Sequence, residues 1–338
     1  MLYGGRYAAA DVADALVDVA RGSSYSDAAR RARSVRAAPG SPVEDDSGPF
    51  DGRLVATWVD RFAPAIVETH AETTWPQTVV LDSTEFTWTN PRTGDRVQLF
   101  TVLAAWGYPV GRKRGRLWAL QAFPTDTAHA WTELLKSLPG EPELVIYDSD
   151  KAVAAAAPLV WPNAEVYLCE HHLYLNARAR LRDDGQHGLG NPYRGLLADA
   201  GQSYTGWSAF RNAVLGAPGL AETRKWVTHW DDQMSHQTAR RPNLPAHRST
   251  GALDPQLAKV RHVLQARAWT YRNLERMNAL LGMVRPSINL QDRPSDWAKV
   301  ILAHAADRPA LTTFNEPAQY LPNEQRVYSL RMHPVQAR

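Results

Sequence analysis

Several kinds of chemistry are absent from this sequence of 338 residues. A single cysteine, Cys169, excludes a disulfide framework and any cluster of cysteine thiolates. No apolar run approaches the roughly 18 residues that a membrane span requires, and the first residues lack the apolar core of a signal peptide. No glycine-rich phosphate loop follows the first expected strand, which counts against a nucleotide-cofactor enzyme. With 44% hydrophobic residues the chain can bury a core, so we expect a cytoplasmic globular protein.

Charge is nearly balanced but unevenly distributed. Lys and Arg number 38 against 35 Asp and Glu, a formal net charge of +3. Acidic residues gather in a Pro-, Gly- and Ser-rich stretch at 39–51, whereas 259–285 is rich in Lys and Arg and holds one acid, Glu275. This pattern permits a nucleic-acid partner, but charge alone favours the alternative of a solvated helix face.

The first 72 residues predict a helical segment. The apolar period of residues 8–20 predicts a helix that Gly22 ends, a second helix follows through 26–33, and a third is expected at about 52–70. Two short helices joined by a Gly-Ser turn suggest the start of a DNA-binding helix-turn-helix, and a small hairpin that only packs on the main domain is the alternative. The basic residues of the second helix are Arg30, Arg31 and Arg33.

From Trp75 onward, short apolar runs separated by turns predict strands. The expected strands are 78–82, 97–105, 117–123, 144–147 and 165–168. Helices are expected at 127–138, 150–157, 170–183, 191–199, 205–214, 219–234, 255–282 and 294–306. The order of elements predicts a mixed α/β sheet with flanking helices, and 185–252 has the composition of an insertion.

Two aspartates each follow an apolar run. Asp82 comes after Val79-Val80-Leu81, and Asp148 comes after Val145-Ile146-Tyr147. Neighbouring strands lie ~4.8 Å apart, so carboxylates at adjacent strand tips converge. Such hard oxygen ligands bind Mg²⁺ or Mn²⁺, and a pair of these ions ~3.5–4 Å apart can activate the nucleophile and stabilise the leaving oxygen in phosphoryl transfer. An Asp at a strand end also caps helices or forms turns, which is the structural alternative.

This order of elements, with its two aspartates, resembles the RNase H-like fold of DDE transposases. Within this fold, residues of roughly 76–285 resemble the Mutator-like transposases and their bacterial insertion-sequence relatives. The motifs that carry the resemblance are Asp148, Trp161-Pro162-Asn163-Ala164, the C-x-x-H of Cys169 and His172, and Asn176. The resemblance implies a structural or DNA-proximal role for the C-x-x-H motif. With one cysteine, a closed zinc site would need three further His or acid ligands.

The resemblance also implies a third acid at the start of a helix after a helical insertion. Asp254, preceded by Ser249-Thr250-Gly251-Ala252-Leu253, fits that setting with Asp in place of the usual Glu, and it is our first candidate. Glu275 offers the usual residue and is the fallback, with an ion-pair role beside neighbouring arginines as its alternative. The separation of Asp254 from Asp148 suits a core that carries an insertion.

Taken together, the resemblance implies a DNA transposase of a bacterial insertion sequence. Asp82, Asp148 and Asp254 would hold two Mg²⁺ (or Mn²⁺) ions, cleave the element ends and join the resulting 3′-OH to target DNA. A homo-oligomer at the nucleoid in the cytoplasm is implied, with no membrane partner. The alternatives are a catalytically decayed, transposase-derived DNA-binding protein, an RNase H-like nuclease without strand transfer, and a small-molecule α/β enzyme. The residues expected to contact DNA are Arg30, Arg31, Arg33, Arg112, Lys113, Arg114, Lys259, Arg261 and Arg267.

The expected division of the chain follows from these assignments. It comprises an N-terminal helical, helix-turn-helix-like DNA-binding segment at 1–72, the first part of an RNase H-like core at 76–184, an all-helical insertion at 185–252, the C-terminal helices of the core at 253–308, and an irregular tail at 309–338.

Overall fold

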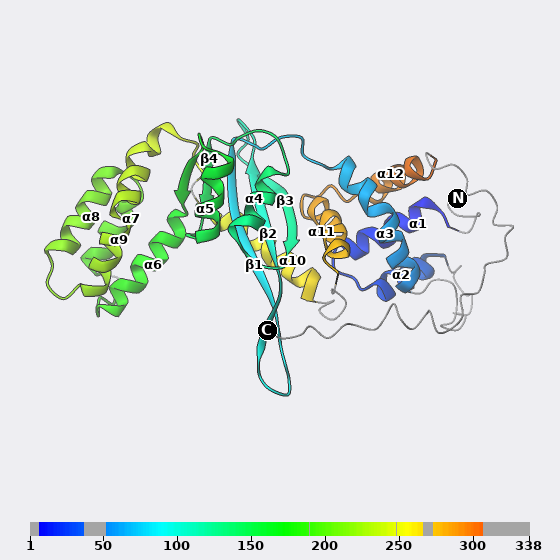
Figure 1. The fold of residues 1–338 in the computed structure, drawn as a ribbon, viewed down its shortest axis with the longest axis horizontal. Helices are drawn as coiled ribbons and strands as arrows, with labels where there is room; N and C mark the ends of the chain where they lie inside the picture. The colour runs from blue at the N-terminus through cyan, green and yellow to red at the C-terminus, as the bar shows by residue number, and fades with distance from the viewer. Residues whose placement is uncertain (1–6, 37–51, 189, 248, 266–272, 307–338) are drawn as a thin grey trace.

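The computed structural model describes residues 7–36, 52–188, 190–247, 249–265 and 273–306. The tail predicted at 309–338 lies outside these ranges. Within the described ranges, no helix combines the length and the apolar character needed to cross a membrane. Figure 1 shows the sheet at the centre, with one helical lobe on each side of it.

One five-stranded sheet forms the core. Its strands are β1 (Thr78–Thr89), β2 (Arg96–Tyr108), β3 (Arg116–Phe123), β4 (Leu144–Tyr147) and β5 (Glu165–Leu168). Their spatial order is β3-β2-β1-β4-β5, in which β2 is antiparallel to β1 and β3, while β4 is parallel to β1 and β5. This mixed sheet with flanking helices has the RNase H-like arrangement, so the predicted fold class is confirmed.

The helices lie mostly where the sequence predicts them. Those before β5 are α1 (Ala9–Ala20), α2 (Tyr25–Arg36), α3 (Gly52–Thr69), α4 (Ala128–Lys136) and α5 (Lys151–Val160). Those after β5 are α6 (Glu170–Asp183), α7 (Pro192–Ala200), α8 (Tyr204–Gly216), α9 (Ala221–Arg240), α10 (Asp254–Gln265), α11 (Leu274–Ile288) and α12 (Pro294–Ala306). A short 3₁₀ turn, η2 (Thr250–Ala252), leads into α10.

Alternation along the strands gives the sheet two buried faces. Val79 and Leu81 of β1 belong to one apolar core, which also contains buried residues of α4, α5 and the helices of the insertion. Val80 belongs to the other core, together with residues of α10, α11 and the N-terminal helices. Side chains at even positions of β1 around Val80 therefore face α10.

The N-terminal helices share a core with the end of the described chain. Helices α1 and α3 both contact α11 and α12, and α2 packs on α1 and α3. Buried Leu16 of α1, Ile66 of α3, Leu280 of α11 and Ile301 of α12 all belong to this one apolar cluster. In Figure 1 these helices form the lobe on the right, opposite α6–α9.

Several sequence-based boundaries are wrong. The helix predicted at 219–234 extends to Arg240, and the strand predicted at 97–105 extends to Tyr108. Asp82 does not end its strand, because β1 continues to Thr89 and pairs with β2 as a long two-stranded arm that Figure 1 shows extending beyond the sheet. The β-branched and aromatic residues after Asp82 favour this extension. The helix predicted at 255–282 is two helices, since Asn273 has an extended backbone and its side chain caps the N-terminus of α11.

Candidate active site

Asp82 stands where the sheet narrows to the two-stranded arm. Parallel pairing between β1 and β4 ends at Val80, so Asp82 lies just beyond the part of β1 that β4 covers. It shares a face of β1 with Val80, the face on which α10 packs. Its Oδ1 accepts a hydrogen bond from the backbone N–H of Ser83 at 2.8 Å.

Asp148 follows the last residue of β4 and lies next to that point. The chain turns sharply after it, because Ser149 has a left-handed backbone with φ of 79°. Asp150 then caps α5, its side chain accepting from the backbone N–H of Ala152 at 2.7 Å. Of the two acids in this turn, Asp150 therefore has a structural role, and Asp148 remains available to the site.

Asp254 is the first residue of α10, as the sequence predicts. Helix α10 packs along β1, and Arg261, two turns further along it, donates to Thr84 of β1 at 2.6 Å. This contact sets α10 alongside the strand with its N-terminus towards Asp82. The side chain of Asp254 is within hydrogen-bonding reach of Asp82.

Asp148 and Asp254 act electrostatically on Asp82. Burial, together with the negative charges of Asp148 and Asp254, raises the pKa of Asp82 to about 7 despite the opposing hydrogen bond from Ser83. The structure thus brings together three acids that come from a strand, a strand end and a helix start, separated widely in the sequence. This repulsion disfavours the ionised form of Asp82 unless a cation lies nearby.

Glu275, the fallback for the third acid, lies elsewhere. It is exposed in the first turn of α11, which packs against β3 and α3 rather than against β1. The adjacent Arg276 pairs with Asp60 of α3 at 2.9 Å, which ties this end of α11 to the N-terminal lobe. The arrangement favours Asp254 over Glu275 as the partner of Asp82.

The C-x-x-H motif joins α6 to the turn before Asp254. The Sγ of buried Cys169 accepts from the backbone N–H of Thr250 at 3.3 Å, and the Thr250 hydroxyl lies 3.2 Å from Nδ1 of His172. Burial raises the pKa of the Cys169 thiol, but hydrogen bonds from His172 and Thr250 outweigh it and lower that pKa to about 7. The sequence identified Thr250 as part of the stretch that precedes Asp254, but it did not predict the contacts of Thr250 with Cys169 and His172.

His172 brings positive charge towards the acids. Its hydrogen bond with Cys169 raises the pKa of the imidazole to about 9 despite partial burial, and the charges of Cys169, Asp148 and Asp254 act in the same direction. The motif therefore has two visible effects: it anchors the turn that leads to Asp254, and it holds an imidazole near two of the three acids.

A second acidic group lies around Ser83, whose side chain alternates with that of Asp82 to the opposite face of β1. Burial raises the pKa of Asp126, hydrogen bonds from Ser83 and Trp131 oppose this, and the charges of Asp150 and Glu85 add to it. The Trp131 indole donates to Asp126 at 2.8 Å. Through these hydrogen bonds Asp126 links α4 to β1, so its role is structural.

The donor set at Asp82 suits a divalent cation. Across the described ranges, no group of three or more His, Cys, Asp or Glu side chains stands close enough to form a ready metal centre. Asp82, Asp148 and Asp254 nevertheless supply carboxylate oxygens alone, which is the chemistry that Mg²⁺ and Mn²⁺ prefer. Burial raises the pKa of Asp82 most and the charges of Asp148 and Asp254 add to it, and such an ion would oppose this charge repulsion.

The predicted DNA contacts fall into separate regions. Arg30 pairs with Asp27 within α2, whereas Arg31 of α2 pairs with Asp18 of α1, so of these two ion pairs the second one joins two N-terminal helices. The side chain of Arg33 and the whole of Arg267 lie outside the described residues.

The remaining predicted contacts are surface residues in two places. Arg112, Lys113 and Arg114 are exposed and line a pocket along the β2–β3 loop. Lys259 and Arg261 lie on α10, where Lys259 bonds Gln256 and Arg261 bonds Thr84 of β1. Among these residues, Arg261 is linked to the acidic site: its partner Thr84 is two residues beyond Asp82 in β1.

Comparison with known proteins gives a distant likeness. No family model and no curated protein matches the sequence. Among solved structures, one similar chain belongs to the Drosophila P element transposase strand transfer complex, at 8% identity and a TM-score of 0.32, covering 89% of this chain and 81% of that one. The class of the core rests on its own strand order, which is that of an RNase H-like domain.

Proposed function

We propose that this protein is a DNA transposase of the DDE/D type, from a bacterial insertion sequence, with Asp82, Asp148 and Asp254 as its catalytic acids. The observation that supports this proposal is the approach of two further carboxylates to Asp82, on one face of an RNase H-like sheet, closely enough to affect its pKa. The three acids come from β1, from the end of β4 and from the start of α10, and Asp254 is within hydrogen-bonding reach of Asp82.

The chain's own groups define what the site does. Asp82 and Asp148 present oxygens from two paired strands, and Asp254 adds a third from a helix that Thr250 and Arg261 hold against the sheet. Two divalent cations held by these oxygens would supply an activated nucleophile and stabilisation of the leaving oxygen. No side chain is needed as a general base, which agrees with a site made of carboxylates alone.

DNA would be the partner in both steps. The basic residues of α10 and of the β2–β3 loop would contact the backbone, and the 3′-OH left by cleavage would attack target DNA in line. Joining two element ends requires at least a dimer, so a homo-oligomer on DNA belongs to the proposal. A bacterial protein that acts on DNA would work at the nucleoid, so a cytoplasmic location is part of the proposal.

A nicking assay tests the catalytic assignment. Supercoiled plasmid with Mg²⁺ or Mn²⁺ should be nicked by the wild type and not by Asp82→Asn, Asp148→Asn or Asp254→Asn, while Glu275→Gln should retain activity. A pre-cut end bearing a 3′-OH should give joined products if strand transfer occurs. Nicking without joining would identify a nuclease, and DNA binding without nicking would identify a decayed, transposase-derived DNA-binding protein.

A further inference from the structure

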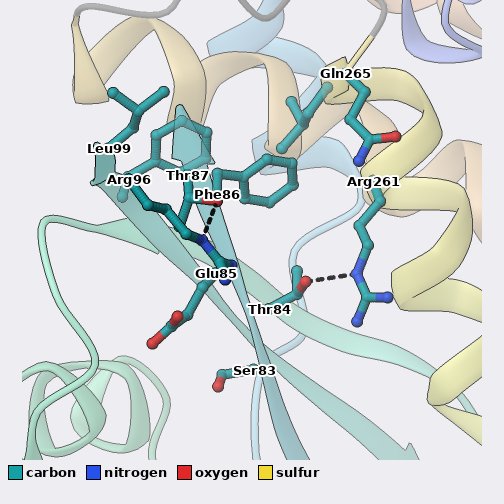
Figure 2. Close-up of a pocket in the computed structure, with 11 residues that line it drawn as sticks. Ser83, Thr84, Glu85, Phe86, Thr87, Arg96, Leu99, Arg261 and Gln265 are labelled. Carbon is teal, nitrogen blue, oxygen red and sulfur yellow. Dashed lines mark hydrogen bonds between the residues drawn. The ribbon is translucent and has the colours of Figure 1, made fainter. Parts of the chain in front are cut away.

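A groove lies along β1 immediately beyond the acidic site. It is a pocket of about 430 Å³ lined by residues of β1, β2 and α10. Its lining includes every β1 residue from Ser83 to Thr87. Figure 2 shows that α10 closes one side of the groove, where Arg261 and Gln265 approach β1. Arg96, from β2, approaches β1 at Thr87.

Two arginines enter this groove in the same manner. Arg261 of α10 donates through Nε to the Thr84 hydroxyl at 2.6 Å, and Arg96 of β2 donates through Nε to the Thr87 hydroxyl at 2.9 Å. Figure 2 draws both hydrogen bonds. An Nε–H bond fixes the plane of the guanidinium and leaves its two terminal nitrogens for another acceptor.

Neither arginine is neutralised by a described partner. Among the ion pairs of the described residues, none involves Arg96 or Arg261, and both side chains are exposed. The groove contains one carboxylate, that of exposed Glu85, against two guanidinium groups. A fixed guanidinium with free terminal nitrogens has the geometry that recognises a phosphate in a bidentate manner.

The spacing along β1 relates these arginines to the acids. Thr84 is two residues beyond Asp82, or about 7 Å along a strand, and Thr87 is three residues further, or about 10 Å. One strand of duplex DNA carries a phosphate every ~3.4 Å along the axis, so two anchors at this spacing can reach different phosphates of one strand. Phe86 and Phe100 stack between them, with ring centroids 4.7 Å apart, and give the groove an apolar floor.

We infer that this groove binds the backbone of the DNA strand that enters the acidic site, with Arg261 and Arg96 each held by a threonine to contact one phosphate. The inference rests on the proposed function and adds the path of the substrate. It assigns a positioning role to four residues, Thr84, Thr87, Arg96 and Arg261, of which Arg96 and the two threonines had no sequence signal as DNA contacts.

Binding measured without metal tests the inference independently of cleavage. The affinity for a 30-base-pair duplex of arbitrary sequence is measured in EDTA as a function of salt, for the wild type, Arg96→Met, Arg261→Met and the double variant. Each lost phosphate contact should reduce the slope of log affinity against log salt by about 0.9. The loss of affinity between 50 and 200 mM salt should therefore shrink about threefold for each arginine. Arg182→Met, an exposed arginine on α6, is the matched control and should leave the slope unchanged.

Threonine variants distinguish binding by arginines that a hydroxyl holds in place from binding by positive charge in general. Thr84→Val and Thr87→Val keep both arginines and remove only the hydroxyl that holds each one. They should weaken binding severalfold, and an unchanged affinity in both would overturn the inference. Equal slopes for the Arg96, Arg261 and Arg182 variants would overturn it as well. Wild-type protein that binds with these slopes yet never nicks DNA would refute the proposed reaction and leave the groove assignment standing.

Discussion

Replacing Asp82 with asparagine should stabilise the metal-free protein at neutral and alkaline pH. Asparagine has nearly the same shape, and its Oδ1 can keep the hydrogen bond from the Ser83 backbone N–H. What the substitution removes is a negative charge that is disfavoured by burial and by Asp148 and Asp254. The residue that the proposed chemistry requires is therefore one that costs folding stability.

The size of the effect follows from proton linkage. The pKa of Asp82 is raised from 3.8 to about 7, so the folded state holds a proton that the unfolded state has already released between these values. Wild-type stability from this group is consequently highest below pH 4 and falls as the pH rises to about 7. At 1.36 kcal/mol for each pKa unit the full penalty is about 4 kcal/mol, and structural relaxation should reduce the measured gain to about 2–4 kcal/mol at pH 8.

Urea unfolding at pH 4.5, 6 and 8 in EDTA measures this difference directly. The gain of Asp82→Asn over the wild type should be largest at pH 8 and should shrink towards zero as the pH approaches 4. Asp232→Asn, on an exposed residue of α9, provides a control that should show no such trend. Adding Mg²⁺ at pH 8 should stabilise the wild type more than Asp82→Asn. A gain that is independent of pH, or a loss at pH 8, would refute the argument that burial and the neighbouring charges raise the pKa of Asp82.

Three further outcomes are expected. Thr250→Val removes the hydroxyl near His172 but keeps the backbone N–H bond to Cys169. Nicking should therefore fall about tenfold and require more Mg²⁺, while DNA binding in EDTA stays unchanged. An equal loss of binding would point to general misfolding. Asp254→Glu, which restores the longer acid, should keep more nicking activity than Asp254→Asn, and equal inactivity of the two would argue against a carboxylate role there. Arg285→Met should cost about 2–4 kcal/mol in urea unfolding, because the buried guanidinium donates to the carbonyls of Trp118 and His70 at 2.9 and 2.7 Å.

The regular parts of the fold were predictable because local pattern and tertiary environment agree. The runs Leu144–Tyr147 and Glu165–Leu168 have the composition and length of buried strands, and both form strands with the predicted bounds. The aspartate after β4 was identified for the same reason. Its position depends on where a short apolar run ends, which the sequence shows directly.

The features that the sequence did not predict depend on tertiary contacts. The extension of β1 to Thr89 depends on pairing with β2, and a reading of the apolar run alone stops at Asp82. The choice between Asp254 and Glu275 depends on which helix packs against β1, which no local motif encodes. Arg96 and Thr87 are nine residues apart across a hairpin, so their hydrogen bond could be predicted only with the register of the arm in hand.

The shared core of the first and last described helices has a consequence for biosynthesis. Helices α1 and α3 bury Leu16 and Ile66 against α11 and α12, and α11 leaves the ribosome about 200 residues after α3. At 5–20 residues per second this delay is roughly 10–40 s, during which the apolar sides of α1 and α3 lack their final neighbours. A nascent chain released before α11 would leave that apolar surface exposed to solvent. Truncated translation products should therefore be cleared by chaperones and proteases rather than accumulate as partial fragments that bind DNA.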